Sequence, residues 1–212
     1  MNLARLDYIR DPAEIYRRSF AGIEAEAGLS HLTPAMRRVA VRLIHACGMS
    51  DLASDLLFSP GAAEAGIAAL AIGATIICDV EMVRSGIIAS RLPPVSTIVC
   101  TLNHEGVAKQ AIATGQTRSA AAAELWGEHL AGAVVAIGNA PTALFRLLEL
   151  LDDGAPKPAL IIGMPVGFVG AAESKAELAA NSRGCPYITI SGRRGGSAFA
   201  AAAINAMARD EK

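Results

Sequence analysis

Short runs of apolar and β-branched residues recur along the chain after its first third. Each run is apolar at nearly every position rather than at alternate positions, which is typical of strands covered on both faces. On this pattern we expect five buried strands, over residues 75–80, 97–102, 134–138, 159–163 and 187–191.

Segments with helical periodicity lie between these runs. They read AAEAGIAALAIG before the first strand, TRSAAAAELWGEHLAG before the third, APTALFRLLELLDD after it, AAESKAELAANSRG before the fifth and SAFAAAAINAMARD at the end. Alternating strands and helices imply parallel crossover connections. We therefore predict an α/β protein with one domain over residues 1–212. Its fold would be a three-layer α/β/α sandwich around a mostly parallel five-stranded sheet, with an N-terminal helical extension.

The segment VRLIHACG places a histidine in a helix of that extension. Thr33 and Pro34 predict the start of this helix, and Gly48 predicts its end. At 100° per residue, one apolar stripe is formed by Met36, Val39, Ala40, Leu43 and Cys47. His45 falls opposite the stripe, one turn after Arg42. It is either a solvated surface histidine or part of a pocket in which Arg42 holds an anion and His45 exchanges a proton.

Two opposed influences act on this histidine. The end of the helix at Gly48 favours the imidazolium, while the neighbouring arginines disfavour it. A histidine balanced in this way is expected to titrate near neutral pH, as an acid–base catalyst requires.

Ligands of open parallel sheets bind beyond the carboxyl ends of the strands. The segments that leave those ends read CDVEMVRSG, CTLNHEG, IGNAPTAL, GMPVGFVGAAESK and SGRRGGS. In IGNAPTAL, a helix start with Asn139 and Thr142 could bind a carboxylate. Thr117 and Arg118 open another helix with the same potential. Each of these segments is equally compatible with a simple capped turn.

The basic residues are mostly arginine, with 15 Arg against 4 Lys. The arginine fork binds carboxylate or phosphate in a bidentate manner, although GC-rich codon usage would give the same excess. The net charge of −1 gives no general attraction for nucleic acid or an acidic membrane.

Several classes of site have no sequence signature here. The four histidines lack metal-ligand spacing, no GxSxG segment occurs, and neither GxxxxGK[ST] nor GxGxxG is present. The N-terminus lacks the apolar core of a signal peptide, and the uncharged runs are too short to span a membrane. The four cysteines form no CxxC pair and fit a reducing cytoplasm. We expect a cytoplasmic protein without a metal site.

These same segments resemble the precorrin-8X methylmutase family. The matching stretches are DYIRDPAEIYRRSF, VRLIHACG, CDVEMV, TRSAAA, AGAVVAIGNAPTALF, GAPKPALIIGMPVGFVGAAESK and GGSA. They run from residue 7 to beyond residue 195, and GMPVGFVGAAESK is highly specific. The resemblance implies a flavodoxin-like fold and a homo-oligomer whose active site lies near a subunit interface. It also implies a 1,5-sigmatropic methyl shift from C-11 to C-12 that converts precorrin-8X to hydrogenobyrinate in cobalamin biosynthesis. The resemblance implies that this step requires no organic cofactor or metal.

The resemblance also implies roles for particular residues. His45 falls on the family's catalytic histidine, which would protonate or hydrogen-bond a ring nitrogen near the migrating methyl. Ser19 and Arg42 fall on substrate-contacting positions. Further expected substrate contacts lie in matching motifs at Arg10, Glu81, Met82, Arg118, Asn139 and Thr142. The segment TLNHEGVAKQAIATG matches no motif of the family, and its His104 receives no catalytic role.

Three alternatives stay open from the sequence. The natural substrate could be the cobalt form, cobalt-precorrin-8, although the residues that make up the motifs favour the metal-free branch. The chain could be a non-catalytic tetrapyrrole carrier that contacts neighbouring pathway enzymes transiently. The fold alone would also fit a flavin or nucleotide protein, against which the missing phosphate-loop spacings count.

Overall fold

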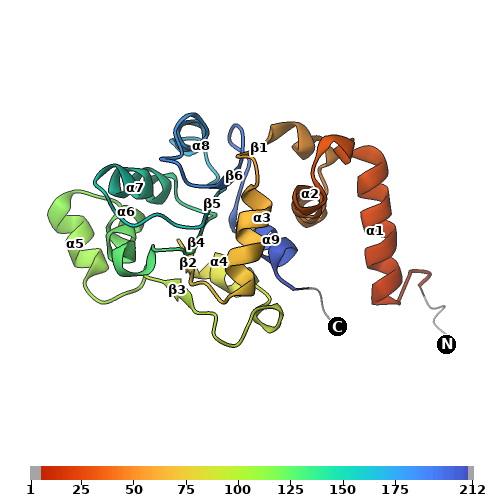
Figure 1. The fold of residues 1–212 in the computed structure, drawn as a ribbon, viewed down its shortest axis with the longest axis horizontal. Coiled ribbons are helices and arrows are strands. Elements are labelled where there is room, and N and C mark those ends of the chain that lie inside the picture. The colour runs from red at the N-terminus through yellow and green to blue at the C-terminus, as the bar shows by residue number, and fades with distance from the viewer. Residues whose placement is uncertain (1–5, 210–212) are drawn as a thin grey trace.

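The computed structural model describes residues 6–209, which fold around one mixed sheet (Figure 1). Within this range the sheet has six strands in the order β1-β6-β5-β4-β2-β3. Their bounds are β1 Leu56–Phe58, β2 Ile76–Cys78, β3 Ile98–Cys100, β4 Val134–Ile137, β5 Leu160–Gly163 and β6 Tyr187–Ile190. Strands β2 to β6 pair in parallel, whereas β1 pairs antiparallel with β6.

The prediction of five strands missed one strand, the edge strand β1. The five predicted strands are present and parallel, as expected. β1 has only three residues, pairs with β6 alone and is at most half-buried. It therefore lacks the long, fully apolar run by which the other strands were recognised.

Helices cover both faces of the sheet, which confirms the three-layer architecture. The α-helices are α1 Pro12–Glu26, α2 Pro34–Cys47, α3 Ala62–Ala71, α4 Glu81–Gly86, α5 Val107–Thr114, α6 Arg118–Ala123, α7 Pro141–Asp152, α8 Ala171–Ala180 and α9 Ser197–Met207. Short 3-10 helices are η1 Leu29–His31, η2 Ser50–Asp55, η3 Ala89–Arg91 and η4 Glu124–His129. The segment predicted as one helix from Thr117 changes from α6 to η4 at Glu124, where Trp126 enters the core.

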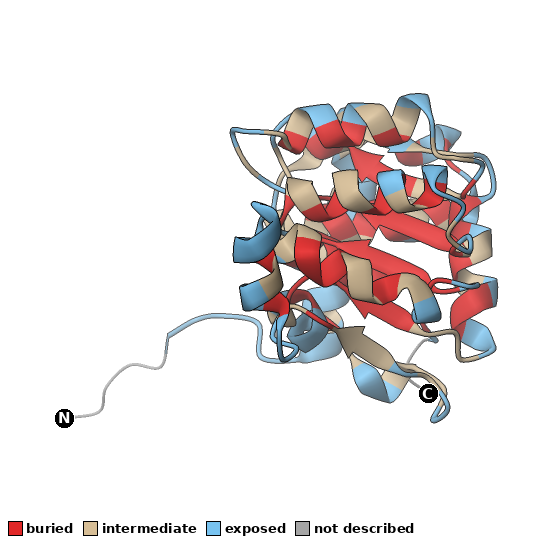
Figure 2. Cartoon of the chain, turned by 90° about the vertical axis from the view of Figure 1, so that its left-hand side faces the viewer, coloured by how far each residue is buried: buried red, intermediate tan, exposed pale blue. Residues whose placement is uncertain are grey.

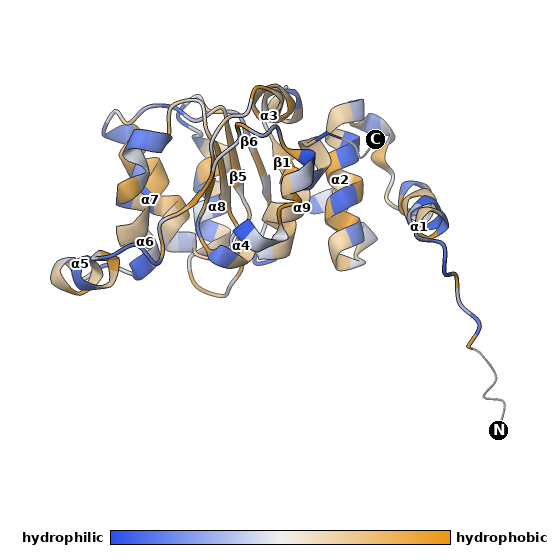
Figure 3. Ribbon diagram, turned by 90° about the horizontal axis from the view of Figure 1, so that it is seen from below, coloured by the Kyte–Doolittle hydropathy of each residue, from blue (hydrophilic) through white to orange (hydrophobic). Residues whose placement is uncertain are grey.

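Successive strand residues alternate between two apolar cores. Ile76 and Cys78 of β2 face the core formed with α2, α3 and α9, while Ile77 between them faces the core formed with α7 and α8. Figure 2 shows buried strands behind the helices of one face, and Figure 3 shows helices on both sides of the sheet. This double burial explains why the strands are apolar at every position.

The N-terminal extension consists of α1 and α2. Helix α2 packs chiefly on α9, and α1 lies outside it, against α2 (Figure 1). None of the fifteen residues of α1 is buried, and Ile15 and Tyr16 are exposed. Across residues 6–209, the helices all fall short of the length and apolarity needed to cross a bilayer.

Candidate active site

His45 lies in the last turn of α2. The Thr33 hydroxyl accepts the Met36 N–H at 3.3 Å, so the predicted N-cap is confirmed. Gly48 ends the helix with a φ of 71°, and its N–H donates to the Ile44 carbonyl at 2.7 Å.

The end of α2 lies at the carboxyl edge of the sheet because β1 runs antiparallel. The chain passes from α2 through η2 into β1, whose first residue, Leu56, pairs with Ile190. Ile190 is the last residue of β6. The short connection η2 thus joins the end of α2 to the edge at which ligands of parallel sheets bind.

Helix α1 covers the face of α2 that carries His45. The Ser19 hydroxyl lies 2.8 Å from His45 Nδ1. The ring centroids of Tyr16 and Phe20 lie 5.5 Å and 5.4 Å from that of His45, with Phe20 edge-on. The histidine is therefore not a fully solvated surface residue. It is half-buried beside a hydroxyl and two aromatic rings.

Burial lowers the pKa of His45, and the nearby Arg42 guanidinium lowers it further. The Arg42 Cζ lies 5.6 Å from the Tyr16 ring centroid and 5.3 Å from that of Phe20. The lowering of the His45 pKa by burial and by Arg42 thus outweighs the helix end, which was expected to favour the imidazolium. A neutral imidazole that accepts the Ser19 proton at Nδ1 carries its own proton on Nε2, which is then available as a donor.

Asp79 directly follows β2 and lies at the same carboxyl edge, farther along the sheet from β1. Its buried carboxylate accepts the backbone N–H groups of Gly138 at 3.0 Å and of Asn139 and Ala140 at 2.9 Å. Burial raises the pKa of Asp79, and these three N–H groups oppose the rise. The carboxylate fixes the loop between β4 and α7 and leaves Asn139 exposed at the edge. Sequence reasoning missed Asp79, although an acid directly after a fully apolar strand was a usable signal.

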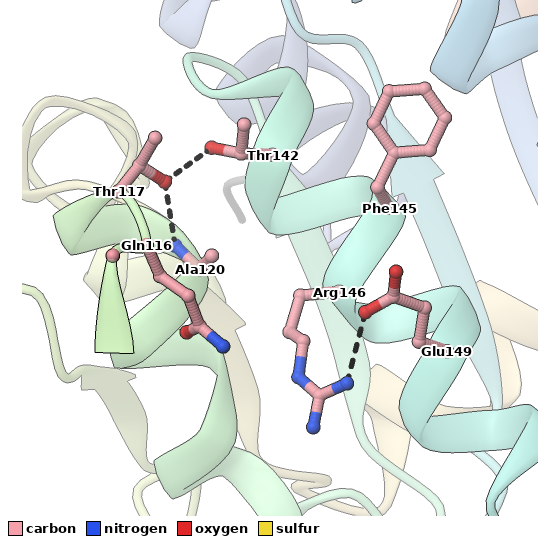
Figure 4. Close-up of a pocket in the computed structure, with 8 residues that line it drawn as sticks. Gln116, Thr117, Ala120, Thr142, Phe145, Arg146 and Glu149 are labelled. Atoms are coloured by element: carbon pink, nitrogen blue, oxygen red, sulfur yellow. Dashed lines mark hydrogen bonds and ion pairs between the residues drawn. The ribbon is translucent and has the colours of Figure 1, made fainter. Parts of the chain in front are cut away.

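The starts of α6 and α7 meet at this edge. The hydroxyls of Thr117 and Thr142 lie 2.7 Å apart (Figure 4). Beside them lies a cavity of about 370 Å³ between the two helices, bordered farther down by Arg146 and Glu149. The Arg118 guanidinium donates to Asn103 Oδ1 at 2.9 Å and to the Leu102 carbonyl at 3.2 Å.

The remaining predicted contacts are more scattered. Glu81 and Met82 begin α4, where Met82 is 72% exposed and Glu81 lies 3.6 Å from the Arg84 guanidinium. Arg10 precedes α1, donates to the Leu6 carbonyl at 2.7 Å and stacks over the Tyr8 ring at 4.1 Å.

The structure therefore assembles two groups of predicted residues. Ser19, Arg42 and His45 form one group on α1 and α2. Thr142 lies beside the start of α6 in the other group, which also holds Arg118 and Asn139. Figures 1 and 3 show α1 and α2 at one end of the molecule, with α5, α6 and α7 at the opposite end. One chain does not bring the two groups together.

Comparison with known proteins identifies relatives along nearly the whole chain. The family model CbiC, described as precorrin-8X methylmutase, matches residues 14–210. A precorrin-8X methylmutase of Pseudomonas aeruginosa is 61% identical over 98% of this chain and 100% of its own length. One from Sinorhizobium sp. is 56% identical over 96% and 97%. A cobalt-precorrin-8 methylmutase of Priestia megaterium is 38% identical over 92% and 87%.

A solved structure gives the same result. The precorrin-8X methylmutase of Thermus thermophilus superimposes with a TM-score of 0.83 at 39% sequence identity, covering 92% of this chain and 94% of that one. The arrangement of sheet and helices described above is thus shared with that enzyme.

Proposed function

Because this chain belongs to the precorrin-8X methylmutase family and is an isomerase of cobalamin biosynthesis, we propose that His45 is its acid–base group. The reaction moves a methyl group of precorrin-8X from C-11 to C-12 and gives hydrogenobyrinate. One carbon–carbon bond breaks and another forms, so the product has the same atoms and the same oxidation level. A proton given to the ring at the start must be returned at the end, and one histidine can do both.

The observation that carries the proposal is the 2.8 Å contact between Ser19 Oγ and His45 Nδ1. A serine that donates to Nδ1 leaves Nε2 protonated and fixes the orientation of the ring. The Nε2–H can then donate to a ring nitrogen near the migrating methyl and make the receiving carbon more electrophilic. Because burial and Arg42 lower the pKa of His45, the neutral imidazole that this arrangement requires is favoured more than in a free histidine.

The substrate carries seven acetate and propionate arms around an apolar ring. Arginines and helix starts at the carboxyl edge suit such arms. We assign these contacts to two sets: Arg10, Ser19 and Arg42 near α1 and α2, and Glu81, Met82, Arg118, Asn139 and Thr142 at the sheet edge. Residues of both sets can reach one macrocycle if a second copy of the chain supplies one set. The exposed Ile15 and Tyr16 on α1 support such a homo-oligomer.

The test of the proposal is His45→Ala. General acid–base groups contribute about 10²- to 10⁴-fold to rate, so we expect a loss of that size in conversion of precorrin-8X, with binding of the macrocycle retained. Conversion is followed by the change in pigment absorption. The exposed His129→Ala serves as the matched control. Undiminished turnover by the His45 variant contradicts the assignment.

The same assay addresses the alternatives. A carrier would bind the pigment without changing its spectrum. Turnover of precorrin-8X compared with its cobalt form distinguishes the two pathway branches, and the two most similar relatives described above favour the metal-free form. A cytoplasmic location is supported by the free thiols of all four cysteines.

A further inference from the structure

A lysine of α8 is fully buried. Lys175 has no exposed surface, and its Nζ donates to the Arg194 carbonyl at 2.5 Å. Lysine is almost never fully buried unless it is paired, because taking an ammonium out of water is costly. Burial lowers the pKa of Lys175 to about 8, and the Asp55 carboxylate opposes that change. The catalytic step proposed above makes no use of this lysine.

The carbonyl that Lys175 holds belongs to a loop that is also tied on its other side. The Arg194 guanidinium donates to the carboxylates of Asp51, at 2.9 Å, and of Asp55. Asp55 in turn accepts the Ser191 hydroxyl at 3.1 Å and, through its backbone carbonyl, the Ser191 N–H at 2.7 Å. Asp51 and Asp55 lie in η2, the connection that follows the helix of His45. Residues 191–194 are thus held between α8 and η2.

This loop packs directly on the glycine-rich loop after β5. The Gly196 N–H donates to the Met164 carbonyl at 2.9 Å, and the Gly167 N–H donates to the Arg193 carbonyl at 3.3 Å. A Cβ at Gly195 would lie 2.4 Å from the Met164 carbonyl oxygen, so only glycine fits. The two loops are therefore joined by backbone hydrogen bonds and close packing.

Their outer surface presents an apolar face beside a cation. Phe168 is 83% exposed, and Val169 beside it is 89% exposed. The Arg193 guanidinium lies 5.1 Å from the Phe168 ring centroid. An aromatic ring next to a guanidinium matches a ligand that has a flat apolar ring and carboxylate arms.

We infer that Lys175 is a positioning residue whose hydrogen bond to the Arg194 carbonyl sets Arg193 and Phe168 as a substrate-binding pair. This inference rests on the proposed function, because the ligand of the pair is the tetrapyrrole. Lys175 touches no substrate and acts through the loop. Its ammonium is a stronger donor than a neutral amine, so the loop is held more firmly when Lys175 is protonated.

The charged groups that face Lys175 come from two elements. From η2 it is the Asp55 carboxylate, and from the loop it is the Arg194 guanidinium, which is bonded to Asp55 and to the more exposed Asp51. From β6, the uncharged Thr189 uses its hydroxyl to donate to the Gly163 carbonyl. The Asp55 carboxylate therefore favours the ammonium of Lys175, and Arg194 offsets part of its charge.

The variant Lys175→Met tests the inference, with the exposed Lys109→Met as the matched control. Loss of one hydrogen bond to a charged group corresponds to roughly a tenfold rise in the KM for precorrin-8X, with kcat changed less than about twofold. In the unmodified enzyme, KM should rise between pH 7 and pH 9, and in Lys175→Met it should be high at every pH. Unchanged KM in Lys175→Met, or a pH profile like that of the unmodified enzyme, overturns the inference.

Hydrogen exchange of the loop provides a readout without substrate. In the unmodified protein, protection factors of peptides 164–170 and 192–196 should fall as pH rises through about 8, relative to a peptide from β4. This measurement needs no variant, so it stands even if Lys175→Met fails to fold. Constant protection across that range refutes the role of Lys175. Failure of His45→Ala to lose activity, with the loop behaving as expected, would instead refute only the catalytic assignment.

Discussion

Replacing Ser19 by Ala would remove the hydroxyl that contacts His45, the proposed acid–base group, while leaving the aromatic neighbours of the histidine in place. Ser19 lies 2.8 Å from His45 Nδ1 and is half-buried, so alanine introduces no new charge and no clash. The imidazole would lose the group that selects its tautomer. The fold should be unaffected, because no residue of α1 is buried in the described chain.

The size of the effect follows from the value of one hydrogen bond. A neutral hydrogen bond contributes about 0.5–1.5 kcal/mol net, which corresponds to roughly a twofold to tenfold decrease in kcat. The loss in His45→Ala should be larger, about 10²- to 10⁴-fold. If Ser19 acts through His45, the double variant should be no slower than His45→Ala alone.

The assay is single-turnover conversion of precorrin-8X by both single variants and the double variant, followed by absorption. The exposed Ser30→Ala controls for the general effect of removing a serine hydroxyl. Losses that multiply in the double variant would refute the reasoning. They would mean that Ser19 contributes to turnover through its substrate contact alone and not through the histidine.

Two further predictions concern charged side chains, Arg42 of α2 and Asp79 after β2. In Arg42→Met the pKa of His45 should rise, because the cation that disfavours the imidazolium is gone; the imidazolium then persists to higher pH, as NMR titration of the four histidines would reveal. An unchanged His45 titration would contradict this. Asp79→Asn should destabilise the fold by about 3 kcal/mol, because an amide cannot accept all three backbone N–H groups, and urea unfolding measures the loss. Asp153→Asn is the exposed control, and a loss below about 1 kcal/mol in Asp79→Asn would show that the carboxylate is dispensable.

The central strands and α2 were predictable because their determinants are local. The parallel strands are apolar at every position since both faces are covered. Helix α2 carries a capping threonine, a proline at its first position and a terminal glycine. The edge strand β1 carries no such signal, because three residues of which none is buried resemble any short loop.

The surroundings of His45 were only partly predictable. The helical wheel separated His45 from the apolar stripe, but the docking of α1 on that face is a tertiary event. A usable signal existed in α1, where Tyr16, Ser19, Phe20 and Ile23 recur at helical spacing and predict a face for packing. The role of Asp79 was harder to predict from the sequence, because the three N–H groups that it accepts lie about 60 residues away along the chain.

Because α1 is only shallowly buried, the contact between Ser19 and His45 need not be formed in every molecule at once. Ser19 meets His45 only while α1 is docked on α2, and a helix without a buried residue in the described chain has little to oppose its local release. The fraction of molecules with an assembled pair then multiplies the intrinsic rate, and anything that covers Ile15 and Tyr16 raises that fraction. Turnover per chain should therefore increase with protein concentration if the cover is a second chain.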